Sequence, residues 1–296
     1  MAKISDLTTT QFSGDPRADA LLDEPVPWNY YPDGRTVLYY TFDASPGSLI
    51  DQQTVAVVRQ FNAAQIVAAR QIMQYAATVT GITFVEVASS AQADIHFGAT
   101  NLQGPSVAGL TSWNYSYYHD ASYTITQLNI EAIIYLDNVE HAGINTTPQA
   151  GDYGYEVLLH EVGHVLGLGH PFDSARPLLA AEDNTNNTVM SYTSAGGAKS
   201  VFQPYDLLAL QWIYGGDGLG GLWGFNSANG PALPSPGPVE IPGTSGADVF
   251  RGSAADEAFD GRGGVDVLVL QGALLLRFGQ FGWRAGGGGL DLVGAT

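Results

Sequence analysis

The segment from His160 to His170 reads HEVGHVLGLGH, which has the pattern H-E-x-x-H-x-x-G-x-x-H. On a helix, His160 and His164 lie one turn apart on the same face, so two imidazoles can bind one metal ion. Glu161 lies beside the first of them, where its carboxylate can reach a water on the metal rather than the metal itself. Gly167 can end the helix in a left-handed conformation, and the chain can then turn back and bring in His170 as a third ligand. Three protein ligands with one open position are the arrangement of a catalytic zinc site.

The competing interpretation is an ordinary buried helix whose histidines are satisfied by hydrogen bonds. It is disfavoured because a core helix gains nothing from three imidazoles and a carboxylate on one side. Apolar residues surround the ligand face and favour a packed helix: Tyr155, Leu158, Leu159, Val162, Val165 and Leu166.

A second segment, Thr188-Val-Met-Ser-Tyr192, follows the motif and resembles the Met-turn of the metzincin metalloproteases, in which a methionine lies under three histidines. Pro171, directly after the third histidine, and Tyr192, two residues after Met190, resemble the serralysin-type metzincins, which are secreted bacterial zinc endopeptidases. The resemblance extends to residues 19–42 and to the helix-like run 203–215, and covers most of residues 18–270.

The resemblance implies an α/β (α+β) catalytic domain with a mixed, twisted sheet and an active-site helix. It implies that His160, His164 and His170 bind zinc and that Met190 supports them. It also implies that Tyr192 is a further zinc ligand that can swing away to stabilise the transition state. Glu161 is expected to act as the general base. Substrates would be proteins or peptides, an inhibitor protein stays open as a partner, and we expect a monomer.

Composition excludes some functions. The chain has 296 residues, a net charge of −18 and only 11 Lys plus Arg, which argues against binding to a phosphate backbone. It has no cysteine, so neither disulfides nor thiolate metal sites are available. No run of 18 apolar residues that could span a membrane is present.

The first residues, Met1-Ala-Lys-Ile-Ser-Asp6, lack the apolar core of a secretory signal, which taken alone favours the cytoplasm. The resemblance implies the opposite, because serralysins leave the cell through a type I system that reads a C-terminal signal. We therefore expect a secreted, extracellular protein without a leader.

Periodicity predicts strands at 36–43, 82–87, 93–98 and 130–136, a helix at 51–80, and hairpin strands in the Tyr-rich run 108–128. The resemblance implies that strand 93–98 forms the upper rim of the cleft and pairs with extended substrate. That strand contains His96, which is not expected to bind zinc because the set of three histidines is already complete. His119 and His141 are expected to be surface or structural residues.

Four regions are expected. Residues 1–27 are an N-terminal extension, and whether they are a removable pro-segment or a loosely packed terminus stays open. Residues 28–230 would form the catalytic domain. Residues 231–242 are a Pro-rich linker, and residues 243–296 would form a short β-roll with a C-terminal tail.

The last region begins with three nine-residue units that start at Gly243, Gly252 and Gly261 and follow G-G-x-G-x-D-x-U-x, the RTX-type repeat of calcium-binding parallel β-rolls. Two units make one coil, so residues 18 apart stack, and Asp248 and Asp266 could share one Ca²⁺. Serralysins usually carry more repeats, so the number of calcium ions is left open.

Two other functions compete. One is another metzincin branch, astacin-like or matrixin-like; Tyr192 argues against the matrixins, and the repeats argue against both. The other is a calcium-dependent extracellular binding module with a vestigial protease site. The intact Glu161 argues against it, because a retired site does not need its base.

Overall fold

The structure, a computed structural model, describes residues 2–22, 26–44, 57–225 and 227. In the C-terminal part it describes residues 246 and 247 and the backbone of the strands between residues 239 and 293. Contacts divide the chain into two units, Met1–Pro231 and Ala232–Thr296. No helix in the described ranges combines the length and the apolar character needed to cross a membrane.

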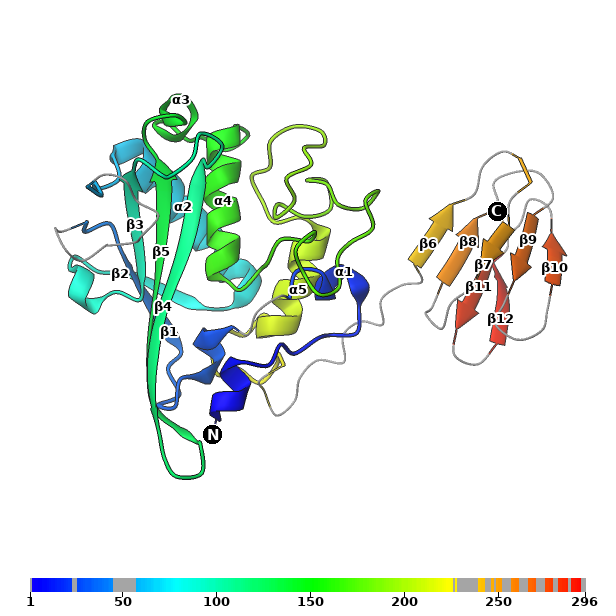
Figure 1. Cartoon of the computed structure of the whole chain (residues 1–296), viewed down its shortest axis with the longest axis horizontal. Helices are drawn as coiled ribbons and strands as arrows, with labels where there is room; N and C mark the ends of the chain where they lie inside the picture. Colours follow the sequence, from blue (N-terminus) through cyan, green and yellow to red (C-terminus); the bar gives the residue numbers. More distant parts are fainter. Residues whose placement is uncertain are drawn as a thin grey trace. The chain divides into compact units, whose positions relative to one another are not determined.

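The first unit is built on a five-stranded sheet with the order β2-β1-β3-β5-β4 (Figure 1). Four strands are parallel to their neighbours, and β4 lies at one edge, antiparallel to β5. This confirms the mixed sheet predicted from the sequence. The strand bounds are β1 Val37–Thr41, β2 Thr83–Glu86, β3 Ile95–Thr100, β4 Gly109–His119 and β5 Ile125–Asp137.

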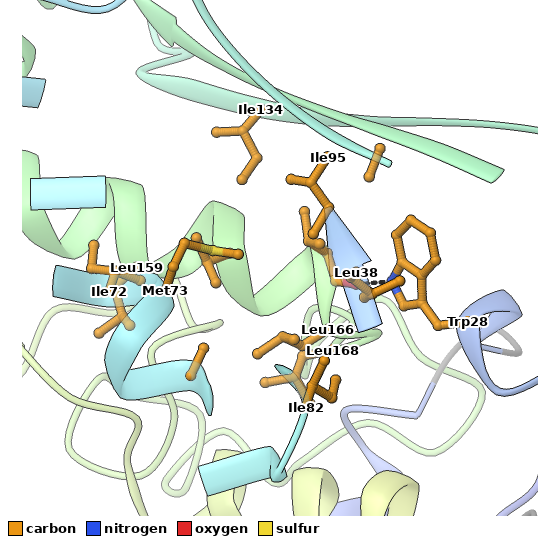
Figure 2. Close-up of a cluster of buried hydrophobic side chains, with 14 of the residues drawn as sticks. Trp28, Leu38, Ile72, Met73, Ile82, Ile95, Ile134, Leu159, Leu166 and Leu168 are labelled. Carbon is orange, nitrogen blue, oxygen red and sulfur yellow. Dashed lines mark hydrogen bonds between the residues drawn. The ribbon is translucent and has the colours of Figure 1, made fainter. Parts of the chain in front are cut away.

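Two longer helices, α2 (Ala63–Thr80) and α4 (Tyr153–Val165), pack against one another and against this sheet. In Figure 2 the sheet residues Ile95 and Ile134 face a layer of apolar side chains from these helices. The remaining short elements are α1 Pro16–Asp19, α3 Ala142–Asn145, α5 Pro204–Tyr214 and the 3₁₀ turns η1 Ile4–Leu7, η2 Pro27–Tyr30 and η3 Ser90–Gln92.

The start of α2 differs from the prediction of a helix over 51–80. Residues 51–56 lie outside the described residues, and 57–62 are not helical. The Asn62 side chain caps the helix by accepting from the backbone N–H of Ala64 and Gln65, at 2.9 and 3.1 Å. Just before the cap, Arg59 exchanges two backbone hydrogen bonds with Ala99. The helical periodicity was therefore misleading for residues 57–62, because Arg59 uses its backbone groups to pair with the sheet.

The prediction that strand 93–98 forms the rim of the cleft is wrong. The corresponding strand, β3, lies between β1 and β5, and all six of its residues are buried. The edge strand is instead β4, from the Tyr-rich run in which a hairpin was predicted. The other arm of that hairpin, β5, continues through the predicted strand 130–136 as one element.

The described backbone of the second unit forms seven strands in two sheets, with bounds β6 Val239–Pro242, β7 Val249–Arg251, β8 Glu257–Asp260, β9 Asp266–Val269, β10 Leu275–Phe278, β11 Gly282–Gly286 and β12 Gly289–Val293. The parallel pairs match Val239 with Glu257 and Val249 with Val267, residues 18 apart in each case. The strands from β10 onward pair antiparallel, unlike a roll. The β-roll therefore stays a prediction. So does the calcium site, because Asp248 and the side chain of Asp266 lie outside the described residues.

Candidate metal centre

The end of α4 forms a tight turn that leads the chain from His164 to His170. Leu168 N–H donates to Gly163 C=O at 3.0 Å and Gly167 N–H to His164 C=O at 2.9 Å, the pair of hydrogen bonds of a Schellman motif. Gly167 has φ +92°, and a Cβ there would overlap the side chain of Val26. The turn thus needs glycine for two reasons: its backbone conformation, and the close approach of a neighbouring segment.

Two side chains from distant segments donate hydrogen bonds to the same end of α4. The Trp28 indole N–H donates to Val165 C=O at 2.7 Å, and Trp28 is only 1% exposed (Figure 2). The Tyr214 hydroxyl donates to Leu166 C=O at 2.9 Å. These donors satisfy carbonyls that a helix end leaves without intrahelical partners, and they fix the direction in which the chain leaves the helix.

The structure brings the three histidines of the motif together. Their Nε2 atoms lie 3.1 Å apart for His160 and His164, 3.1 Å for His164 and His170, and 3.3 Å for His160 and His170. In the described part of the chain, these three residues are the only group of His, Cys, Asp or Glu whose ligand atoms converge in this way.

The outer nitrogens of two rings are held by backbone carbonyls. His160 Nδ1 donates to Val189 C=O at 2.8 Å, and His164 Nδ1 to Leu168 C=O at 2.7 Å. Because a carbonyl only accepts, a neutral ring then carries its lone pair on Nε2 and presents it to the centre of the cluster. Burial lowers the pKa of His160 to about 4 and holds the pKa of His164 well below its usual value, so both rings are neutral at physiological pH.

This donor set fits zinc. Ligand nitrogens at about 2.0–2.1 Å from a tetrahedral ion lie about 3.3–3.4 Å apart, close to the separations of the three Nε2 atoms. Neutral, oriented imidazoles whose lone pairs converge also repel one another unless a cation lies between them. The geometry therefore suits an ion held by His160, His164 and His170, with a further position open toward the cavity.

Met190 packs against α4, the helix that carries His160 and His164. It is fully buried, and a Cβ on Gly163 would lie 2.6 Å from its Sδ, so the glycine inside the motif makes room for the methionine. The turn that carries Met190 is held by Asp206 in α5, which accepts from Thr188 Oγ1 at 2.5 Å and from Val189 N–H at 3.0 Å. Asp206 therefore holds in place the residue, Val189, whose carbonyl accepts from His160.

Glu161 lies in the same cavity as the three histidines and is 4% exposed. Its Oε2 accepts from Thr111 Oγ1 at 2.7 Å, and a Cβ on Gly109 would lie 2.6 Å from its Oε1. Both neighbours belong to the edge strand β4. Burial raises the pKa of Glu161 to about 8, and the Thr111 hydrogen bond opposes this rise. A divalent cation beside it would lower that pKa again.

Tyr192 is 69% exposed, yet its hydroxyl lies 3.1 Å from His170 Nε2. Phe172 stacks on His170 with ring centroids 5.1 Å apart and packs against Tyr192 at 4.8 Å. Burial of the hydroxyl end and the nearby Glu161 charge raise the pKa of Tyr192, so it keeps its proton at neutral pH.

The other histidines lie apart from this cluster. His96 is buried in β3 with its Nδ1 3.2 Å from Ser90 Oγ, His119 is exposed, and His141 Nε2 lies 3.1 Å from Pro105 C=O. Neither Gly109 nor Thr111 was predicted from the sequence. No local pattern marks them, since they reach Glu161 only because β4 lies beside α4.

Comparison with known proteins agrees with the geometry. The matrixin model of the M10 peptidase family matches residues 49–189. The chain is similar to the metalloprotease AprA of Pseudomonas entomophila, with 30% identity over 244 residues, which covers 73% of this chain and 48% of that protein. It is also similar to the serralysin of Proteus mirabilis, with 32% identity over 58% of this chain and 39% of the relative. Serralysin G of Dickeya chrysanthemi is 30% identical over 53% of this chain and 34% of the relative.

The chain thus spans about half the length, or less, of the relatives that it matches. The family model covers the three histidines and Glu161 and ends at Val189, one residue before Met190. The family model and the relatives together support a serralysin-type metzincin.

Proposed function

We propose that this protein is a zinc-dependent endopeptidase that hydrolyses protein or peptide substrates. The observation that carries the proposal is the convergence of three Nε2 atoms in one cavity with a buried carboxylate, Glu161. The similarity to serralysins and to AprA metalloproteases supports it.

Zinc held by His160, His164 and His170 would supply Lewis acidity, polarising a scissile carbonyl and lowering the pKa of water bound beside it. Glu161 is the general base. Its carboxylate takes one proton from the attacking water as the water oxygen bonds to the carbonyl carbon, and then delivers it to the departing amine as the C–N bond breaks.

Thr111 and Gly109 position this carboxylate. The hydroxyl of Thr111 donates to Oε2, which leaves Oε1 facing the backbone of Gly109. A side chain at Gly109 would occupy the space of Oε1, so the glycine is needed for the base to lie where it does.

Tyr192 supplies a proton donor on the side of His170. Its hydroxyl stays protonated, and an exposed side chain can change rotamer at low cost. The role we assign is a hydrogen bond to the oxygen that becomes negative when the carbonyl is attacked.

The edge strand β4 is the surface we assign to peptide binding. It pairs with β5 on one side only, and it passes Glu161 at Thr111. An extended peptide that adds to such an edge gains backbone hydrogen bonds that do not depend on its sequence.

Extracellular action is part of the proposal and follows from the family. Export without a leader through a type I system, and Ca²⁺ bound at Asp248 and Asp266, remain predictions. A binding module with a vestigial site is not favoured, because Glu161 lines the same cavity as the three histidines.

The test combines metal analysis with casein and peptide cleavage. The wild type should bind one zinc at the histidine cluster and cleave casein until a chelator is added. His164→Ala should lose both the ion and hydrolysis, whereas His141→Ala, which changes a histidine outside the cluster, should keep both. Glu161→Ala should keep the ion and lose hydrolysis by several orders of magnitude; wild-type cleavage by this variant refutes the assignment of the base.

Tyr192→Phe should lower kcat with little change in zinc content. Tyr123→Phe is the matched control, since Tyr123 is similarly exposed, at 64% against 69%, lies in the turn after β4 and is not among the residues that line the cavity. Equal rates for the two variants contradict a role for the Tyr192 hydroxyl in the reaction.

A further inference from the structure

Where β3 begins, the sheet of the first unit carries a row of residues that crosses four strands. Tyr40 of β1, Ile95 of β3 and Ala132 of β5 are paired in one register. Asp94, directly before Ile95, donates its N–H to Tyr39 C=O at 2.8 Å, and its own C=O accepts from Ala132 N–H at 2.8 Å. The residues one step earlier on these three segments, with the β4 residue opposite, therefore form this row: Tyr39, Asp94, Glu131 and Asn114.

The side chains of Glu131 and Asn114 point away from α2 and α4. Successive residues of a strand point to opposite faces of the sheet, and Ile134 of β5 faces the helices (Figure 2). Glu131 is three residues from Ile134, so its side chain lies on the other face. On β4, Asn114 is likewise three residues from Thr111, whose side chain contacts Glu161. These two side chains and the candidate metal centre are therefore on opposite faces of the sheet.

A second cavity, of about 400 Å³, opens along this row. All four residues of the row line it, and it shares only Tyr115, from the edge strand, with the cavity of the candidate metal centre. Its volume lies within the range of about 300–1,000 Å³ that small-molecule sites occupy. The other polar and aromatic residues that line it are Tyr31, Arg35, Gln92, Tyr115, Ser116 and Asn129.

An ion pair forms the rigid part of the wall. Arg35 donates two hydrogen bonds to Asp94, at 2.9 and 2.6 Å, in the bidentate geometry that fixes both groups. Asp94 is 7% exposed and also accepts from Tyr39 N–H at 2.8 Å. The Arg35 guanidinium lies 4.5 Å from the ring centroid of Tyr31. The two charges offset one another, so this part of the wall presents shape and rings rather than net charge.

Three other side chains of the wall are available to a ligand: Gln92, Asn114 and Glu131. All three are exposed, and in the described part of the chain their side chains have no hydrogen-bond or ion-pair partner. They come from three different elements, η3, β4 and β5, and converge on one cavity. Each amide both donates and accepts hydrogen bonds, whereas the carboxylate only accepts.

This set of groups favours a neutral ligand that is rich in hydroxyls. An anion only accepts hydrogen bonds and is repelled by Glu131, and an ammonium or guanidinium only donates and leaves the amide N–H groups of Gln92 and Asn114 without partners. A hydroxyl does both, so neighbouring hydroxyls can satisfy amides and carboxylate together. Tyr39 is 36% exposed, and the negative face of its ring attracts the polarised C–H groups of a sugar ring.

We propose that this second cavity is a carbohydrate-binding site for a neutral mono- or disaccharide. Gln92, Asn114 and Glu131 hydrogen-bond the sugar hydroxyls, and the Arg35–Asp94 pair keeps the wall in place. The site does not depend on the proposed endopeptidase function. Together the two sites would let the protein hold a glycan on one face of the sheet and a peptide beside the other.

The experiment uses the full chain with Glu161→Ala, which removes the proposed base and prevents self-cleavage without touching the second cavity. Maltose, cellobiose, lactose and N,N′-diacetylchitobiose are titrated by calorimetry and by saturation-transfer NMR, and at least one of them should bind. Adding Glu131→Ala should raise its dissociation constant about tenfold or more, and adding Gln92→Ala about threefold or more, because each removes a hydrogen-bond partner. Gln103→Ala is the matched control: Gln103 is an exposed amide outside the cavity wall, so the dissociation constant should not change.

The proposal is overturned if none of the four sugars binds, or if the two cavity variants bind them as tightly as Gln103→Ala does. It is also overturned if inorganic phosphate or an oligolysine peptide binds in place of the sugars and the same variants weaken that binding, since the ligand would then be charged. Casein cleavage by the zinc-loaded wild type tests the proposed function alone. Failure to cleave leaves the sugar site standing, and failure to bind sugar leaves the peptidase standing.

Discussion

Gly167→Ala should be among the most damaging small substitutions in the chain. At φ +92° a residue with a Cβ is strained by about 1–3 kcal/mol. The new Cβ also overlaps Val26, and overpacking of this kind costs about 1–3 kcal/mol more. The free energy of unfolding should therefore fall by about 2–6 kcal/mol in the metal-free protein.

Gly151→Ala is the matched control. Gly151 has almost the same φ, +95°, but a Cβ there would have no neighbour within 4 Å. Only the backbone strain should lower its free energy of unfolding, by about 1–3 kcal/mol. Because the turn at Gly167 also leads to His170, Gly167→Ala should raise the zinc dissociation constant by about tenfold or more, whereas Gly151→Ala should leave it unchanged.

Urea unfolding followed by tryptophan fluorescence, with zinc affinity measured by competition with a chromogenic chelator, checks both statements. The double variant Val26→Ala/Gly167→Ala removes the overlapping methyl groups and should show a favourable coupling of about 0.5–3 kcal/mol. Equal losses for Gly167→Ala and Gly151→Ala, with no coupling to Val26, refute the reasoning.

Three further predictions concern groups around the site. Burial raises the pKa of Glu161 from an ordinary value of 4.5 to about 8, so the folded metal-free protein binds a proton that the unfolded chain releases, and the free energy of unfolding falls as pH rises from 4.5 to 8. In Glu161→Gln the free energy of unfolding should fall less between pH 7 and 8, where His160 is neutral in the folded protein and mostly neutral in the unfolded chain; an unchanged slope contradicts the shift. Trp28→Phe removes the donor at the end of α4 and should lower the free energy of unfolding by about 1–3 kcal/mol. Trp212→Phe removes a more exposed hydrogen bond and should lower it by less than about 1 kcal/mol. Equal losses of stability in denaturant titrations contradict this difference. Asp206→Asn loses an acceptor under the Met-turn and should weaken zinc binding about 10–100-fold by loosening the carbonyl that holds His160, and unchanged affinity in a chelator titration argues against this link.

The centre of the site could be predicted from the sequence because its geometry is local. Histidines four residues apart share a helix face whatever the rest of the fold does, and Gly167 marks the place where the helix must turn. Met190 was recognisable by resemblance, but its contact with Gly163 could not be foreseen from spacing alone.

The predictions that were wrong concern how elements are arranged around the sheet, which local sequence patterns do not determine. Strand 93–98 reads as a strand, but nothing in its residues says whether it lies in the middle of the sheet or at the edge. The structure places β3 between β1 and β5, where all six of its residues are buried. The β-branched spacing before Asn62 suggested a longer helix, and pairing with Ala99 prevents it.

The contacts of residues 2–13 were also beyond sequence reasoning. Residues 2–13 are mostly polar and have no periodic apolar pattern, so the sequence offers no signal that distinguishes a docked segment from a loose terminus. The burial of Leu7 and the hydrogen bond from the Trp212 indole to Gln11 C=O emerge only from contacts with distant parts of the chain.

The long reach of such hydrogen bonds has a consequence for how the chain folds. Trp28 and Val165 are 137 residues apart, and Gln11 and Trp212 are 201 apart. Closing loops of this size is costly in entropy and slows folding. During synthesis Gln11 emerges long before its partner Trp212, and Trp28 long before Val165. A truncated nascent chain can therefore form the motif helix but cannot make the contacts that hold the end of the helix. The histidine cluster thus cannot reach its final geometry until nearly all of the first unit has left the ribosome.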